Sequence, residues 1–325
     1  MAAWLEFAAA AVAIMLVGER LSVYADALAE RLGVSRGFIG VVLLGAVTSL
    51  PELITTVASI SLADSTDLAV GNVFGSNLFN ILILAAMDFL YRERTFDKGN
   101  ALTGVLSTGV ALVAVTALVF PALGGSVAHV STFSFVIALT YMVSMWLLYS
   151  FDKGEDHSDE GGDANEMSLS RIVVGTSLAA GVVVVAGVVA THAVDLIAEH
   201  HGLSESFAGG LFLAAATSLP ELVVSLSALR LGATSMAAGN IFGSNLFNLA
   251  ILPIADVLTP ANLFTGLTRP PHLALALGGL LIASVALIGI LLGKRRPLIG
   301  GRIGLDSLAI IALYLLALGA NYSMA

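Results

Sequence analysis

The chain contains ten apolar stretches that are each long enough to cross a lipid bilayer as a helix, which needs about 20 residues. They lie near residues 5–25, 37–60, 68–90, 101–120, 130–150, 171–198, 206–229, 235–258, 272–292 and 303–320. Most are apolar on all sides, as helices surrounded by lipid or by other helices are. Only 11% of the 325 residues are charged, against about 25% in soluble domains. The sequence therefore predicts an all-α integral membrane protein with ten transmembrane helices.

Lysine and arginine are concentrated in every second connection between these stretches. The odd-numbered connections contain or adjoin Arg31, Arg36, Arg92, Arg94, Lys98, Lys153, Arg171, Arg230, Lys294, Arg295, Arg296 and Arg302. The even-numbered connections contain only Arg269. Because positively charged loops stay in the cytoplasm, we expect a multi-pass protein of the cell (plasma) membrane with both termini outside. The acidic segment 152–170 is then a cytoplasmic linker.

The two halves of the chain repeat one another. An offset of 169 residues aligns the TSLPEL of 48–53 with that of 217–222, and an offset of 168 aligns GNVFGSNLFN at 71–80 with GNIFGSNLFN at 239–248. Each half holds five predicted helices, and an odd number means that the second copy enters the membrane with opposite polarity. We expect two inverted five-helix repeats, 1–151 (motif 45–84) and 171–325 (motif 214–252).

Helix-breaking residues recur at matching positions inside four of these stretches. Pro51 and Pro220 lack the N–H group that a helix needs, so backbone carbonyls near Thr48 and Thr217 are expected to leave the helical pattern. Gly75 and Gly243 interrupt the next stretch of each half. We therefore expect helices 2, 3, 7 and 8 to be broken near the midplane. Inverted repeats with interrupted helices are typical of alternating-access transporters.

Two glutamates, Glu52 and Glu221, follow these prolines in an apolar setting where a charge is unfavourable by roughly 2.5–3.5 kcal/mol. Asn80 and Asn248 also fall near the centres of their stretches. Hydroxyl groups accompany them at Thr48, Ser49, Ser76, Thr217, Ser218 and Ser244. A set of oxygen ligands without histidine or cysteine selects hard cations such as Ca²⁺, Na⁺ or Mg²⁺. One divalent ion would neutralise both carboxylates.

The duplicated motifs resemble the α-repeats of the sodium/calcium exchanger branch of the cation/calcium antiporter superfamily, and the resemblance covers essentially the whole chain. It implies an ion site built from residues of both motifs. Those residues are Thr48, Ser49, Glu52, Ser76, Asn80, Thr217, Ser218, Glu221, Ser244 and Asn248. Ca²⁺ would bind Glu52 and Glu221 together with the backbone carbonyls of Thr48 and Thr217. Relatives often carry glycine before Thr-Ser, where this chain has Val47 and Ala216.

The leading interpretation is a secondary active antiporter that exchanges Ca²⁺ for Na⁺ by alternating access, with those ions and the lipid bilayer as its partners. We expect no nucleic-acid partner, no cofactor and no enzymatic activity. A Ca²⁺/H⁺ antiporter of the same superfamily is the alternative, although such relatives usually carry GNxxE in place of TSLPE. A cation channel is the alternative from another class. Many relatives carry aspartate at one or both of Asn80 and Asn248, and two neutral amides argue against potassium co-transport.

Overall fold

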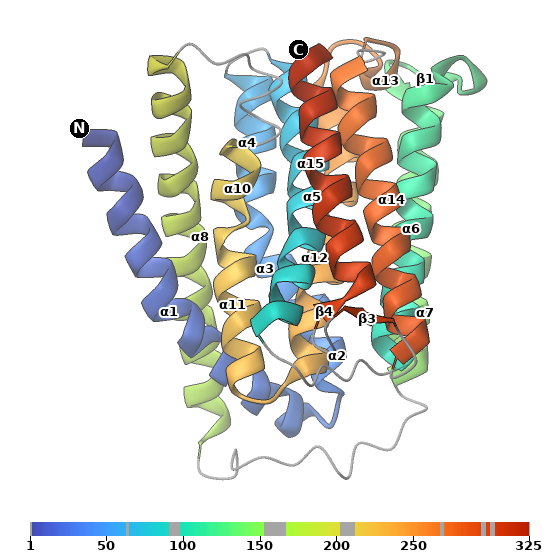
Figure 1. Cartoon of the computed structure of the whole chain (residues 1–325). Helices are drawn as coiled ribbons and strands as arrows, with labels where there is room; N and C mark the ends of the chain where they lie inside the picture. Colours follow the sequence, from blue (N-terminus) through green and yellow to red (C-terminus); the bar gives the residue numbers. More distant parts are fainter. Residues whose placement is uncertain are drawn as a thin grey trace.

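The chain folds into a bundle of long helices that run roughly parallel to one axis (Figure 1). In this computed structural model the described residues are 2–62, 65–90, 98–152, 167–201, 212–266, 270–293, 297–299 and 303–324. Within these ranges nine helical segments are long and apolar enough to cross a membrane. The predicted all-α membrane fold is confirmed. The seventh predicted stretch lies partly outside the described residues. Residues 153–166 of the acidic linker lie wholly outside them.

The first half of the chain contains five helical segments, the second of which is composite. Its helices are α1 (Ala2–Leu32), α2 (Arg36–Ile39), the π-helix η1 (Gly40–Leu44), α3 (Gly45–Thr48), α4 (Leu50–Ser61), α5 (Thr66–Leu90), α6 (Lys98–Val119) and α7 (Thr132–Asp152). A short 3-10 turn, η2 (Pro121–Leu123), and a hairpin of β1 (Ser126–Val127) and β2 (Val130–Ser131) join α6 to α7.

The second half repeats this order. Its helices are α8 (Leu169–His200), α10 (Ala214–Thr217), α11 (Leu219–Arg230), α12 (Thr234–Leu258), α13 (Leu263–Gly266), α14 (Pro270–Leu292) and α15 (Leu305–Met324). A hairpin of β3 (Leu298–Ile299) and β4 (Ile303–Gly304) precedes α15. Both ends of the chain lie at the upper face in Figure 1, and the composite helices α2–α4 and α10–α11 run in opposite directions.

A buried aspartate at the end of each central helix holds the start of a neighbouring helix. Asp256 of α12 accepts hydrogen bonds from the backbone N–H of Ser131 (2.7 Å) and the hydroxyl of Ser134 (2.6 Å). Asp88 of α5, at the equivalent position, accepts one from the hydroxyl of Ser307 at 2.6 Å. These contacts satisfy the buried carboxylates of the two aspartates and fix the starts of α7 and α15 against the centre of the bundle.

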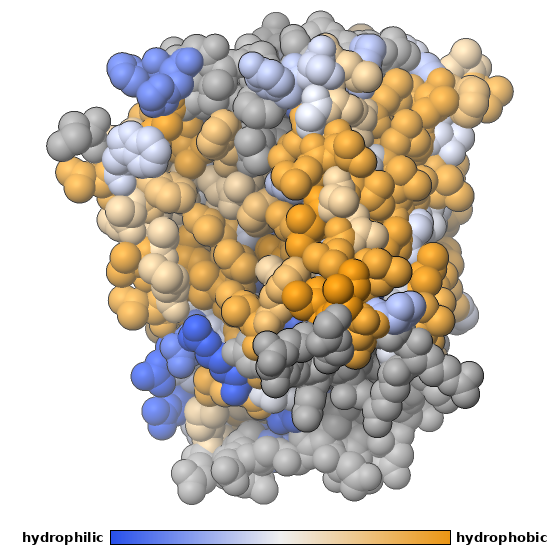
Figure 2. All heavy atoms as spheres, viewed as in Figure 1, coloured by the Kyte–Doolittle hydropathy of each residue, from blue (hydrophilic) through white to orange (hydrophobic). Residues whose placement is uncertain are grey.

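The central helices are buried, whereas the outer helices present apolar side chains outward. Leu16 of α1, Leu178 of α8 and Leu316 of α15 are each about two-thirds exposed (68%, 68% and 67%). Figure 2 shows apolar residues across the middle of the face in view, with hydrophilic residues at its upper and lower left. Without lipid this surface would be an exposed apolar patch far larger than soluble proteins carry, so it is the surface that contacts the bilayer.

The structure interrupts two of the four helices that the sequence predicts to be broken. The chain leaves helical geometry at Ser49 (φ −90°, ψ 4°) and at Ser218 (φ −86°, ψ 7°), each two residues before a proline. The prediction of breaks in helices 3 and 8 was wrong, because α5 and α12 continue through Gly75 and Gly243. Glycine weakens a helix by about 1 kcal/mol but keeps its N–H, and so does not end it.

Gly243 instead allows two backbones to approach closely. A Cβ atom at this position would lie 2.6 Å from both the Cα and the carbonyl oxygen of Val41 in η1. Backbone atoms cannot move aside as the end of a side chain can, so only glycine fits. This contact presses the first composite helix against α12, and thereby brings the TSLPEL motif of one half beside the GNIFGSNLFN motif of the other.

Candidate cation site

Each of the two glutamates lies in the first turn of a helix that begins inside the bundle. Glu52 belongs to the first turn of α4 and Glu221 to that of α11, and both are completely buried. Pro51 and Pro220 stand where the helix has no N–H bond to lose. The partial positive charge of a helix N-terminus stabilises an adjacent carboxylate. The interruption at each serine therefore places a negative charge at a favourable helix end.

The two carboxylates are held by serines from the opposite half of the chain. The Ser49 hydroxyl donates to Oε1 of Glu221 at 3.0 Å, and the Ser218 hydroxyl donates to Oε1 of Glu52 at 3.2 Å. Each motif therefore supplies one carboxylate and the hydroxyl that holds the other. The reciprocal arrangement brings the two carboxylates into one buried site.

The threonines of the two motifs contact the polar residues of the central helices. Thr48 donates to Oδ1 of Asn240 at 3.2 Å and lies 3.2 Å from the Ser244 hydroxyl. The second copy repeats both contacts, with Thr217 donating to Oδ1 of Asn72 at 3.3 Å and lying 3.1 Å from the Ser76 hydroxyl. All of these residues are fully buried. The predicted hydroxyl groups thus surround the carboxylates on both sides.

Asn72 and Asn240 belong to this site although the sequence analysis did not select them. The Asn72 side chain donates to the backbone carbonyl of Glu52 at 3.3 Å, and Asn240 donates to that of Glu221 at 3.3 Å. They are the first asparagines of the duplicated GNxFGSNLFN motif, and that duplication was the available signal. Through these bonds the central helices fix the backbone that carries each carboxylate.

Asn80 and Asn248, the last asparagines of the motif, complete the predicted set and are fully buried. Asn80 donates through Nδ2 to Oδ1 of Asn245 at 3.0 Å. Its own Oδ1 and both polar atoms of Asn248 have no hydrogen-bond partner. The structure therefore joins eight of the ten predicted residues by hydrogen bonds around the interruptions of α2–α4 and α10–α11, whereas Asn80 and Asn248 are buried four residues beyond Ser76 and Ser244 in α5 and α12.

The unpartnered oxygens of the site are the atoms that a cation would satisfy. One oxygen of each carboxylate, Oε2 of Glu52 and Oε2 of Glu221, is buried without a hydrogen bond, as are Oδ1 of Asn80 and Oδ1 of Asn248. A buried acceptor without a partner costs about 1–3 kcal/mol, and more when it is charged. Within the described residues, histidine, cysteine and carboxylate side chains form no cluster of three or more. Such a donor set fits a hard cation held by carboxylate and neutral oxygens.

Comparison with known proteins identifies the family. Residues 2–151 and 171–322 match the sequence profile of the family described as sodium/calcium exchanger protein. The chain belongs to the sodium/calcium exchanger family. Relatives of this exchanger-family chain include the inner membrane protein YrbG of Escherichia coli K12, 30% identical over 274 residues that make up 78% of this chain and 81% of that protein. The sodium/calcium exchanger MaX1 of Methanosarcina acetivorans is 26% identical, over 78% of this chain and 83% of that protein.

Solved structures of an exchanger show the same fold. The sodium-calcium exchanger NCX_Mj, soaked with 2.5 mM Na⁺ and 10 mM Sr²⁺, matches with a TM-score of 0.73 over 98% of both chains, at 19% identity. A structure of NCX_Mj without Na⁺ and Ca²⁺ matches with a TM-score of 0.69 and 20% identity. At this identity the likeness concerns the helical architecture of the exchanger.

The position before Thr-Ser, where exchanger-family members often carry glycine, is filled in this chain by larger residues. Ala216 is buried, and Val47 packs at the edge of the hydrophobic core. The close approach occurs two residues before Val47, at Gly45. A Cβ atom there would lie 2.8 Å from the carbonyl carbon of Gly243. The tight backbone contact of this segment is therefore made at Gly45 and not at position 47.

Proposed function

We propose that this chain is a secondary active antiporter that exchanges Ca²⁺ for Na⁺ by alternating access at the site of Glu52 and Glu221. The observation that carries the proposal is that each buried carboxylate uses one oxygen for a serine of the opposite half and leaves the other without a partner. A buried charge needs a counter-charge. One Ca²⁺ supplies two positive charges to the two carboxylates at once, and brings no charge in excess.

Na⁺ as the counter-ion is supported by the neutral oxygens of the site. The hydroxyls of Thr48 and Thr217 and the amide oxygens of Asn80 and Asn248 are buried oxygen ligands without charge, which suit a hard monovalent cation. These groups bind a cation without a proton being transferred. The name of MaX1 as a sodium/calcium exchanger favours the same coupling. A proton could also neutralise Glu52 and Glu221, so the coupling ion has to be measured.

Alternating access is supported by a difference between two positions that the repeat makes equivalent. The Ser22 hydroxyl of α1 donates to the carbonyl of Val224 in α11 at 3.0 Å. The repeat relates Ser22 to Thr191 of α8 and Val224 to Thr55 of α4. Thr55 and Thr191 instead line a cavity of about 300 Å³. The two ends of the molecule therefore differ at equivalent positions, as a transporter that alternates between two forms requires.

The proposed topology assigns this cavity to one side of the membrane. With residues 1–151 and 171–325 as inverted repeats and 152–170 as a cytoplasmic linker, both termini and the C-terminal end of α4 face outward. The cavity extends along α4 from Ile54 to Leu62. Glu52 precedes Ile54 by two residues in the same helix. In this arrangement the cavity lies on the outer side of the buried site.

The decisive experiment measures Ca²⁺ flux in proteoliposomes that contain the purified protein. Ca²⁺ uptake is recorded with an outward Na⁺ gradient, with a proton gradient, and with neither. We expect uptake that requires the Na⁺ gradient and ceases when choline replaces Na⁺. Uptake that follows the proton gradient would replace Na⁺/Ca²⁺ exchange with Ca²⁺/H⁺ exchange. Uptake without any counter-ion gradient, carried as current, would indicate a channel.

A further inference from the structure

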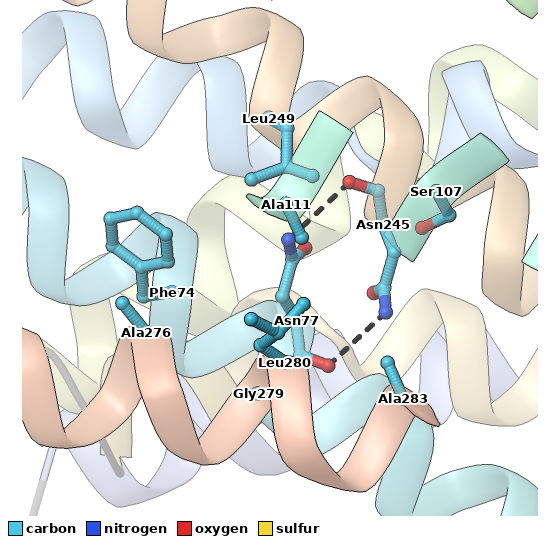
Figure 3. A pocket seen from close by; sticks show the side chains of 10 residues that line it. All are labelled: Phe74, Asn77, Ser107, Ala111, Asn245, Leu249, Ala276, Gly279, Leu280 and Ala283. Atoms are coloured by element: carbon cyan, nitrogen blue, oxygen red, sulfur yellow. Dashed lines mark hydrogen bonds between the residues drawn. The ribbon is translucent and has the colours of Figure 1, made fainter. Parts of the chain in front are cut away.

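Asn77 of α5 and Asn245 of α12 form a reciprocal pair between the two central helices (Figure 3). The Asn77 side chain donates through Nδ2 to the backbone carbonyl of Asn245 at 3.4 Å, and Asn245 donates through Nδ2 to that of Asn77 at 3.2 Å. A backbone carbonyl can only accept a hydrogen bond. Both amide groups are therefore held with their nitrogens toward the partner helix, which leaves each Oδ1 available to accept from another donor.

The side-chain oxygen of Asn245 holds the amide of Asn80. Oδ1 of Asn245 accepts from Nδ2 of Asn80 at 3.0 Å. Because the Asn80 amide has its nitrogen engaged, its oxygen faces away from Asn245, and that oxygen has no hydrogen-bond partner. Asn80 is one of the neutral oxygen ligands of the proposed cation site. Asn245 thus determines which atom of Asn80 is presented to a cation.

The equivalent contact in the other copy is not made. The repeat relates Asn80 to Asn248 and Asn245 to Asn77, so Nδ2 of Asn248 would donate to Oδ1 of Asn77. In the structure both of these atoms are buried without a partner. The serine–glutamate, threonine–asparagine and threonine–serine contacts of the site occur in both copies. The asymmetry is therefore specific to the amides at these positions.

Two further observations bear on this asymmetry. The first is that Ser22 and Val224 are in contact, whereas the equivalent Thr191 and Thr55 line a cavity, so the amides are unequal in a molecule whose two ends already differ. The second is a small cavity of about 20 Å³ beside the asparagine pair, also lined by Ser107 of α6. A space of that size holds about one water molecule, so the pair is not tightly enclosed on that side.

We propose that Asn77 and Asn245 are positioning residues that act in turn. In the form seen here, Asn245 orients the oxygen of Asn80 toward the cation, and Asn248 is not held. When the site faces the opposite side, Asn77 holds Asn248 in the same way and Asn80 is released. The proposal rests on the proposed cation exchange, and it adds which neutral ligand is fixed on each side of the membrane. Neither positioning residue contacts the cation itself.

The test is the sidedness of Ca²⁺ affinity. Asn245→Leu and Asn77→Leu are reconstituted, and the KM for Ca²⁺ is measured separately from each face of the membrane, with whichever ion gradient drives Ca²⁺ in the unchanged protein. We expect Asn245→Leu to raise the KM from the outer face by about five- to tenfold, as the loss of one buried hydrogen bond implies, with less than about a twofold change from the inner face. Asn77→Leu should show the converse.

A double substitution tests whether Asn245 acts through Asn80. Ca²⁺ binding is followed by the thermal stabilisation that Ca²⁺ gives the detergent-solubilised protein, which reads binding without transport. Once Asn80→Ala is present, adding Asn245→Leu should change the apparent Ca²⁺ affinity by less than about twofold. Equal changes from both faces, or independent effects in the double variant, would overturn the positioning role. An unchanged protein that moves no Ca²⁺ with either gradient, yet is stabilised by Ca²⁺, would refute the proposed exchange and leave this binding test decisive.

Discussion

The hydroxyl of Ser49 in the first half of the chain donates to a carboxylate oxygen of Glu221 in the second half, at 3.0 Å. The equivalent bond joins Ser218 to Glu52 at 3.2 Å. These serines are the residues at which the two composite helices are interrupted. The interruption therefore does more than free backbone groups, because it also turns a hydroxyl toward the carboxylate of the other half and makes the two halves parts of a single site.

Ser49→Ala and Ser218→Ala should each weaken Ca²⁺ binding. A hydrogen bond to a charged group contributes about 1.5–3 kcal/mol, so we expect the KM for Ca²⁺ to rise by about tenfold or more, and by similar factors in the two variants. The measurement is Na⁺-driven Ca²⁺ uptake in proteoliposomes. Ser144→Ala is the matched control, because that buried hydroxyl donates to the carbonyl of Thr140 within α7. A serine variant indistinguishable from the control would contradict the role of the cross-repeat bond.

Glu52→Gln and Glu221→Gln should each abolish Ca²⁺ uptake while the protein remains folded and inserted. Glutamine keeps the size of the side chain and removes one of two negative charges, and losing one partner of a buried ion pair costs about 3–5 kcal/mol, which is more than about 100-fold in affinity. Uptake is compared with that of Glu6→Gln, an exposed glutamate of α1. Size-exclusion elution of each variant establishes folding. Near-normal uptake in either buried variant would mean that the site lies elsewhere.

The membrane helices and the two site glutamates can be predicted from the sequence because each depends on the residue types of a short segment. Apolar length predicts the membrane helices, and a proline beside a glutamate in both halves marks Glu52 and Glu221. The prediction that Gly75 and Gly243 break their helices was wrong, since a glycine can either end a helix or allow another backbone to approach. Only the distance between Gly243 and Val41 distinguishes the two cases, and sequence does not contain that distance.

The residues that the sequence analysis missed have partners in other helices. Asn72 and Asn240 lie in the duplicated motif, yet their role depends on which backbone carbonyl they face. The reciprocal contact of Asn77 and Asn245 depends on how α5 and α12 cross. Helix crossing is set by the packing of many side chains together. A repeated motif can therefore indicate that these asparagines matter without indicating what they hold.

Gly243→Ala should destabilise the protein. The added Cβ would lie 2.6 Å from backbone atoms of Val41, and overpacking of this kind costs typically about 1–3 kcal/mol. We expect a lower midpoint of thermal unfolding in detergent. Gly109→Ala in α6 is the control, because a Cβ added there would meet no atom of a neighbouring element within 4 Å and alanine favours a helix by up to about 1 kcal/mol. Equal midpoints for the two variants would contradict the close approach of η1 and α12.

Exchange at this site should move net charge if three Na⁺ replace one Ca²⁺. Ca²⁺ neutralises the carboxylates of Glu52 and Glu221, whereas three Na⁺ leave one positive charge in excess. A membrane potential negative inside would then favour Na⁺ entry and Ca²⁺ extrusion by about 2.3 kcal/mol per charge at 100 mV. The potential of the vesicles is set with K⁺ and valinomycin while Na⁺-driven Ca²⁺ flux is recorded.

The dependence on potential then distinguishes the stoichiometries. We expect Ca²⁺ efflux against Na⁺ influx to accelerate as the interior becomes more negative, because each cycle carries one charge inward. If the rates stay the same at every imposed potential, three-for-one exchange is excluded, and two Na⁺ or two protons must balance each Ca²⁺. If the flux follows potential without a Na⁺ gradient and tracks pH, protons rather than Na⁺ neutralise the two carboxylates. Glu52 and Glu221, together with neutral asparagines at 80 and 248, give the site two negative charges. This charge therefore determines how much positive charge the counter-ions must bring for each Ca²⁺.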